Sequence, residues 1–131
     1  MDIKLLRSSI QELKVLFVKD EEAVQKGTLN LLNKFFKTVI VANNGAEAIT
    51  KFEQNGCIDV IISDIKMPQL DGFKMAQQLK EYNSDFYLVF LTGTLEEYRN
   101  EVSIANDVII KPLGYEDLIN VLEKIHQFFS K

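Results

Sequence analysis

Five short runs of apolar residues, rich in β-branched and aromatic side chains, recur along the chain and are typical of β-strands. Several of them are continuously apolar rather than alternating, as expected for strands that are covered on both faces. The pattern predicts strands at residues 15–18, 38–41, 60–62, 87–91 and 108–110.

Between these runs, apolar residues recur at the three- and four-residue spacing of helices that bury one face. This spacing covers residues 24–36, 46–52, 73–79, 95–105 and 118–129. Strands that alternate with helices predict a parallel sheet with helices on both faces and right-handed crossovers. The predicted fold is therefore an α/β domain of three layers, doubly wound around a five-stranded sheet.

Residues 1–13 precede this alternation and carry a helical stripe of their own. Ile3, Leu6, Ile10 and Leu13 recur at spacings of three and four residues. One interpretation is a short leader helix that docks on the domain. The other is the end of a longer helix, in a parent protein or a dimer.

Composition narrows the class of protein. The chain has 131 residues, 15 Lys and Arg against 19 Asp and Glu, and a net charge of −4, which argues against a broad cationic face for nucleic acid. No apolar run approaches the roughly 20 residues that span a membrane. The single Cys57 excludes an internal disulfide and is expected to be a small buried apolar group. We expect a cytoplasmic domain that binds neither nucleic acid nor membrane.

Chemistry is expected where parallel strands end, because sites of open α/β sheets form at the carboxyl edge. Each residue there has an ordinary explanation when taken alone, as a helix cap, a turn residue or a solvated charge. Together they provide a hydroxyl, carboxylates and ammonium groups on one edge. The residues that follow the strands are Lys19, Asp20 and Glu21, then Asp64 and Lys66, then Thr92 and Thr94, and then Lys111.

These groups match the requirements of phosphoryl transfer to a carboxylate. A carboxylate can act as the nucleophile and form an acyl phosphate. Mg²⁺ prefers carboxylates, other oxygen donors and water, and Asp20, Asp64 and the Lys66 carbonyl can supply them. The Lys111 ammonium can neutralise charge on the phosphoryl oxygens, and the Thr92 hydroxyl can donate to them.

Four strings, in this order, resemble the receiver domain of two-component response regulators over roughly residues 14–129. The most specific is Asp-Ile-Lys-Met-Pro-Gln-Leu-Asp-Gly at residues 64–72, after an apolar strand. The others are Val-Leu-Phe-Val-Lys-Asp-Glu at 15–21, Leu-Thr-Gly at 91–93 and Lys-Pro at 111–112. The resemblance implies a flavodoxin-like fold with strand order 2-1-3-4-5, and it divides the chain into a leader at 1–13 and a receiver domain at 14–131.

The resemblance also implies roles for individual residues. Asp64 would accept a phosphoryl group from a sensor histidine kinase or a phosphotransfer protein, and Asp20 would bind Mg²⁺. Lys111 would contact the phosphoryl group through a cis bond to the next proline, and Thr92 would swing inward. The side chains of Lys66 and Thr94 would influence dephosphorylation. The protein would not be an enzyme beyond the self-catalysed phosphorylation and dephosphorylation of Asp64.

Lys19 departs from the family, whose first strand usually ends in two acidic residues. A shift by one residue would offer Asp20 and Glu21 as that pair, but the apolar run favours the unshifted alignment. If Lys19 points into the site, the affinity for Mg²⁺ falls. If its long stem carries the charge to solvent, the site is less affected. We expect a weakened but working metal site.

Val108 is the second departure, because receivers commonly place an aromatic residue three positions before the site lysine. Its ring turns inward when the threonine moves, which a valine cannot reproduce. The expected output surface, which is also the expected dimer surface, is formed by residues 95–105, 108–110 and 118–129. An unidentified downstream partner would read it.

The leading hypothesis is a switch in which phosphorylation of Asp64 shifts an equilibrium between two surfaces. The alternative is a pseudo-receiver, a phosphorylation-independent binding module whose metal site is compromised by Lys19. A nucleotide- or flavin-binding protein is a third hypothesis, and it is disfavoured because the chain lacks glycine-rich phosphate-binding motifs.

Overall fold

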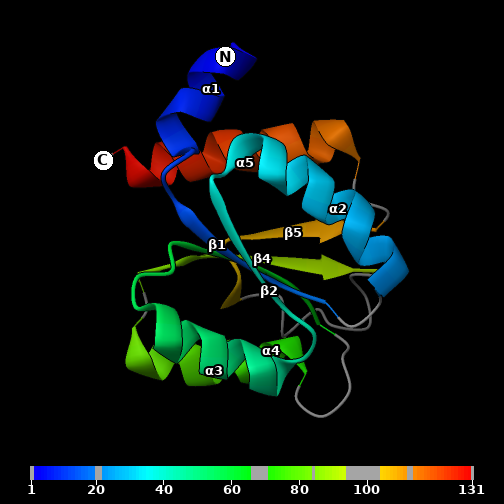
Figure 1. The fold of residues 1–131 in the computed structure, drawn as a ribbon, viewed down its shortest axis with the longest axis vertical. Coiled ribbons are helices and arrows are strands. Elements are labelled where there is room, and N and C mark those ends of the chain that lie inside the picture. The colour runs from blue at the N-terminus through cyan, green and yellow to red at the C-terminus, as the bar shows by residue number, and fades with distance from the viewer. Residues whose placement is uncertain are drawn as a thin grey trace.

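The five apolar runs form one parallel β-sheet with the strand order β2-β1-β3-β4-β5 (Figure 1). This confirms the predicted fold class and strand order. Each strand begins or ends within two residues of the predicted position. The strands are β1 (Lys14–Val18), β2 (Thr38–Ala42), β3 (Val60–Asp64), β4 (Tyr87–Thr92) and β5 (Asp107–Ile110).

The computed structural model describes most of the chain. It leaves undescribed residues 1, 20–21, 66–70, 84, 94–103, 112–113 and 131, and the side chains of residues 22–26. The helix predicted over 95–105 falls mainly on residues that are not described.

Helices cover both faces of the sheet. Figure 1 shows α2 and α5 on one face and α3 and α4 on the other. Each face buries its own hydrophobic cluster, one centred on Phe17 and Leu122 and the other on Phe90 and Leu79. The helices are α1 (Ile3–Ile10), α2 (Glu22–Phe35), α3 (Gly45–Asn55), α4 (Gly72–Tyr82) and α5 (Tyr115–Phe129).

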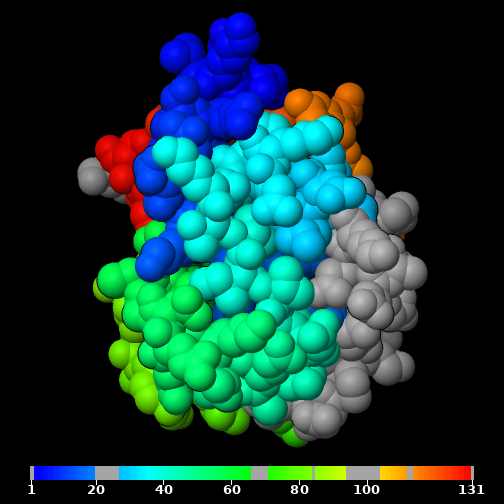
Figure 2. All heavy atoms as spheres, viewed as in Figure 1, coloured from blue at the N-terminus to red at the C-terminus, as the bar shows by residue number. Residues whose placement is uncertain are grey.

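The N-terminal helix α1 packs on α5. Leu6 and Ile10 are fully buried there, while Leu5 on the other side of the helix is 63% exposed. The Asp2 carboxylate caps the helix by accepting from Lys4 N–H at 2.8 Å. Figure 2 shows α1 protruding at the end of the molecule away from α3 and α4.

The expectation of a buried Cys57 is wrong, since the residue is exposed. It lies in the connection between α3 and β3, one residue before Ile58, which takes the buried position instead. Apolar character alone did not reveal which of two neighbours points inward. Within the described ranges, no helix is long and apolar enough to cross a membrane.

Candidate functional site

The strand register brings four of the predicted site residues to one edge of the sheet. Val18 is paired with Ser63, so Lys19 and Asp64 follow side by side at the ends of β1 and β3. Thr92 ends β4 and is paired with Ile110, which precedes Lys111. The chain turns from β2 on one side of β1 to β3 on the other, so Lys19 and Asp64 flank the switch point where such folds bind ligands.

Asp64 lies at the centre of this edge, and its side chain is only 2% exposed. Each of its carboxylate oxygens has an ammonium group nearby: Lys111 Nζ is 2.8 Å from Oδ1, and Lys19 Nζ is 3.5 Å from Oδ2. Neither oxygen has a hydrogen bond of good geometry to another described residue. The two lysines therefore provide the charge compensation that a buried carboxylate requires.

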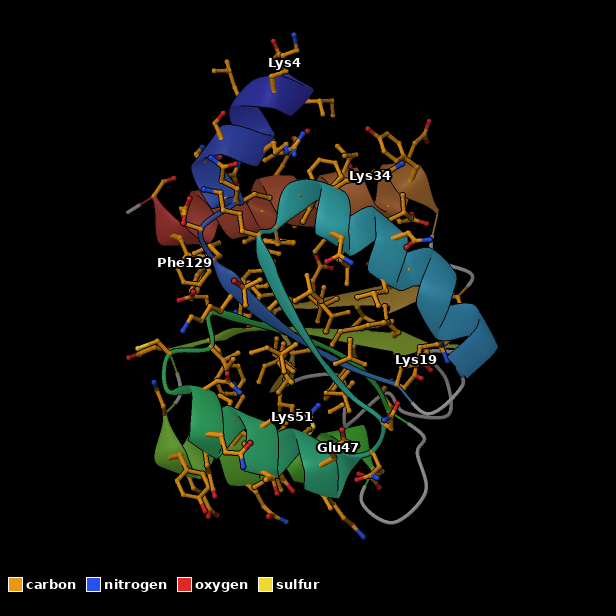
Figure 3. All side chains as sticks on the ribbon, in the orientation of Figure 1. Lys4, Lys19, Lys34, Glu47, Lys51 and Phe129 are labelled. Atoms are coloured by element: carbon orange, nitrogen blue, oxygen red, sulfur yellow. The ribbon has the colours of Figure 1, made fainter. Side chains whose placement is uncertain are left out.

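The two lysines differ in exposure. The Lys111 side chain is 39% exposed, so it reaches Asp64 from the solvent side. The Lys19 side chain is 3% exposed, and its backbone N–H donates to Ala42 O at 3.0 Å, which extends the β1–β2 pairing by one residue. Lys19 therefore points into the site, and the alternative in which its charge reaches solvent is wrong. Figure 3 labels Lys19 at the end of the sheet toward which the strands run.

The start of α4 packs against the end of β3, next to Asp64. Gly72 N–H donates to Ile65 O at 2.7 Å, which brings the first turn of α4 against the end of β3. Asp71 caps this helix by accepting from Lys74 N–H at 2.8 Å. The buried Ser63 hydroxyl donates to Asp64 O at 2.7 Å. Gly72 thus holds the first turn of α4 against the end of the strand that carries Asp64.

Thr92 and Val108 lie on the β4–β5 side of the site. Thr92 is 4% exposed, and its carbonyl accepts from Lys111 N–H at 2.8 Å. This bond fixes the main chain of Lys111 beside the end of β4. Val108 is paired with Phe90 in the sheet and packs, partly buried, against the cluster beneath α3 and α4.

An ion pair in α3 contacts the end of β2, and the sequence did not predict it because the residues directly after that strand have no charge. Lys51 and Glu47 lie one turn apart in α3, with Lys51 Nζ 3.2 Å from Glu47 Oε1 (Figure 3). Lys51 Nζ also donates to Val41 O at 2.7 Å. Asn43 N–H donates to Glu47, and this bond, with the nearby Lys51, lowers the pKa of the Glu47 carboxyl. The four-residue spacing within the helix was the available signal. The pair thus contacts the main chain of β2 near its end.

Four predicted site residues, Asp20, Glu21, Lys66 and Thr94, lie outside the described residues, as does the proline after Lys111. The described chain holds no group of three acidic, histidine or cysteine side chains that could bind a metal. Asp64 alone is a suitable Mg²⁺ ligand there, since it is a buried carboxylate whose oxygens lack hydrogen bonds. Among the described residues the fit to Mg²⁺ is therefore partial, with one suitable carboxylate and the Lys19 ammonium 3.5 Å from it.

The fold and this edge define a flavodoxin-like α/β protein with a buried carboxylate between two lysines. Comparison with known proteins is consistent with this class. The family model for the response regulator receiver domain matches residues 15–123. The response regulator receiver protein CpdR of Brucella abortus is 28% identical over 115 residues, which cover 86% of this chain and 95% of CpdR.

Other relatives are longer proteins. Protein MrkE of Klebsiella pneumoniae is 31% identical over 118 residues, covering 88% of this chain but 44% of MrkE. The chain thus spans less than half the length of several curated relatives. Among solved structures, the response regulator TrrA of Thermotoga maritima, in complex with Mg²⁺-BeF, is 26% identical with a TM-score of 0.76, covering 87% of this chain and 99% of TrrA.

The protein therefore belongs to the response regulator receiver domain family, and it is a receiver domain of two-component systems. Its relatives include sensor kinases, such as CckA of Brucella abortus, which is 34% identical over 84 residues that cover 63% of this chain and 9% of CckA.

Proposed function

We propose that this receiver domain is a phosphoacceptor and that Asp64 is the residue modified. The observation that carries the proposal is the 2.8 Å contact between Lys111 Nζ and Asp64 Oδ1 at the carboxyl edge of the sheet. A carboxylate held beside an ammonium can meet an incoming phosphoryl group whose negative charge is already partly offset. The same carboxylate without that cation would repel the donor.

The reaction joins one Asp64 oxygen to phosphorus and breaks the bond from phosphorus to a histidine nitrogen of the donor. That nitrogen keeps the bonding electron pair and takes up a proton, so an acyl phosphate and a neutral histidine remain. Lys111, being partly exposed, can stay with the phosphoryl oxygens as they arrive. Thr92, at the adjacent strand end, is the hydroxyl proposed to respond to them.

Mg²⁺ is the proposed cofactor, with reduced affinity. When bound, it would offset the charge on the phosphoryl oxygens. Asp64, Asp20 and the Lys66 carbonyl are the ligands we propose. The protein would catalyse only its own phosphorylation and dephosphorylation, without acting on another substrate.

A sensor histidine kinase or a phosphotransfer protein is the proposed donor, which is supported by the sensor kinases among the relatives. We place the protein in the cytoplasm, where an exposed thiol such as that of Cys57 stays reduced. The proposed output and dimer surface includes β5 and α5, where Ile110 is 51% and Tyr115 is 49% exposed. No direct contact with nucleic acid or membrane is proposed.

The test is incubation with acetyl phosphate and Mg²⁺, followed by intact-mass measurement. We expect a phosphoryl adduct on the wild-type protein and none on Asp64→Asn. Asp85→Asn, which removes an exposed carboxylate near the start of β4, is the matched control and should be labelled like the wild type.

A pseudo-receiver is the second candidate function, and the buried contact between Lys19 and Asp64 is the observation that favours it. In that case the ammonium already neutralises the carboxylate, and partners bind without phosphorylation. No adduct on the wild-type protein, under conditions that label an ordinary receiver domain, would establish this alternative and overturn the first.

A further inference from the structure

Lys19 is a buried cation whose place in the site is fixed by the fold. It follows β1 directly, its main chain is bonded to β2, and its side chain is 3% exposed. A buried ammonium needs a compensating negative charge close by. Among the described residues, Asp64 is the carboxylate within ion-pair distance, with Oδ2 at 3.5 Å.

The two ammonium groups contact different oxygens of the Asp64 carboxylate. Lys111 contacts Oδ1 and Lys19 contacts Oδ2. Only Lys111 has the exposure that allows it to move with an incoming phosphoryl group. Lys19 is buried beside Oδ2, and its main-chain bond to Ala42 fixes where its side chain starts. A divalent cation likewise places positive charge beside the reacting carboxylate in phosphoryl transfer.

We propose that Lys19 acts as a built-in cation that replaces part of the charge of Mg²⁺ at Asp64. The proposal rests on the function proposed above. It has two consequences: Mg²⁺ binds weakly because a fixed ammonium repels it, and phosphorylation of Asp64 depends only weakly on Mg²⁺. In the transfer, the bonds made and broken are those given above, and Lys19 changes none of them.

The first test measures binding of the metal alone. Isothermal titration calorimetry with Mg²⁺ compares the wild type with Lys19→Met, which keeps most of the length of the side chain and removes its charge. We expect the variant to bind Mg²⁺ at least about tenfold more tightly, because repulsion by a unit charge at this range is removed. Equal affinities would overturn the proposal.

Two controls accompany this titration. Lys37→Met removes an exposed lysine that pairs with Glu12 before the start of β2, at the other end of the strands, and it should bind Mg²⁺ like the wild type. A gain equal to that of Lys19→Met would show a general charge effect and would contradict the proposal. Lys19→Gln serves as a second neutral variant if Lys19→Met fails to fold, as judged by circular dichroism.

The second test measures labelling by acetyl phosphate, in Mg²⁺ and in excess chelator. We expect Mg²⁺ to accelerate labelling of the wild type by less than about tenfold, and labelling of Lys19→Met by a much larger factor. Equal dependence on Mg²⁺ in both proteins would overturn the inference while leaving the proposed function standing. If neither protein is labelled at Asp64, the proposed function fails, and the calorimetry still decides whether Lys19 takes the place of the metal.

Discussion

Gly72 lies against the main chain of Asp64, so closely that a Cβ atom at Gly72 would stand 2.1 Å from the Asp64 carbonyl oxygen. No side chain fits there without movement of the end of β3 or of the first turn of α4. The glycine of the Asp-Gly string thus sets the position of the phosphoacceptor candidate through backbone contact.

Gly72→Ala should therefore lower the free energy of unfolding by about 1–3 kcal/mol, because the added methyl group overpacks a backbone contact. Gly27→Ala is the matched control, since a Cβ there meets nothing within 4 Å. Gly27 lies inside α2, so alanine should stabilise the protein by about 0.5–1 kcal/mol. Denaturant unfolding measures both changes, and a Gly72→Ala protein as stable as the wild type would contradict the close approach.

The packing of α1 predicts a contrast between two neighbouring leucines. Leu6→Ala should lower the free energy of unfolding by about 2–5 kcal/mol, because Leu6 is a fully buried residue of α1. Leu5→Ala, at a 63% exposed position of the same helix, should change stability by less than about 0.5 kcal/mol. Unfolding in denaturant measures both, and similar values for the two variants would mean that α1 does not dock as described.

Tyr87 predicts a loss of stability at alkaline pH. Burial of its hydroxyl and the charge of Asp107 raise the pKa of Tyr87 to about 12, above the usual 10.0. Below about pH 10 both states keep the proton, so this group contributes no pH dependence. Between about pH 10 and 12 only the unfolded chain ionises, so the free energy of unfolding falls, by about 1 kcal/mol near pH 11.

Tyr87→Phe removes that ionisation and keeps the ring, which packs edge to face on Phe128 with centroids 5.3 Å apart. The variant should lose less stability than the wild type between about pH 9 and 11. Denaturant unfolding at the two pH values provides the comparison. The same loss of stability in both proteins would show that groups other than Tyr87 control the stability at alkaline pH.

Lys111 predicts a kinetic effect at the proposed site. Lys111→Met should slow labelling of Asp64 by acetyl phosphate at least about tenfold, because the ammonium beside Oδ1 is lost. Lys34→Met, at an exposed position in the last turn of α2, should be labelled at the wild-type rate. The measurement is the time course of the adduct by intact mass, and equal rates would remove Lys111 from the proposed mechanism.

The sequence predicted the sheet well because each strand contains a run of at least three consecutive apolar residues, and the resemblance added the strand order. Residues at the strand ends were also predictable, since parallel strands finish at one edge. Lys19 was recognised as a departure, but the direction of its side chain depends on the packing of β1 between β2 and β3. The prediction of a buried Cys57 was wrong for a similar reason, because tertiary contacts decide which of two adjacent apolar residues is buried.

The role of Gly72 also depends on a tertiary contact that the sequence does not reveal. Gly72 ends the string at residues 64–72 that carries the resemblance, but the reason for a glycine there is the approach of the Asp64 backbone, eight residues away in sequence. The pair of Glu47 and Lys51 was missed because it reaches the end of β2 from a helix rather than from the strand itself.

Modification of Asp64 is the central claim, and mapping of the modified residue tests it most directly. After labelling with acetyl phosphate and Mg²⁺, borohydride reduces an acyl phosphate to an alcohol that peptide mass spectrometry can locate. We predict that the reduced residue is Asp64 in the wild type and that Asp64→Asn shows none. A reduced residue at another carboxylate, or equal labelling of Asp64→Asn, would contradict the claim.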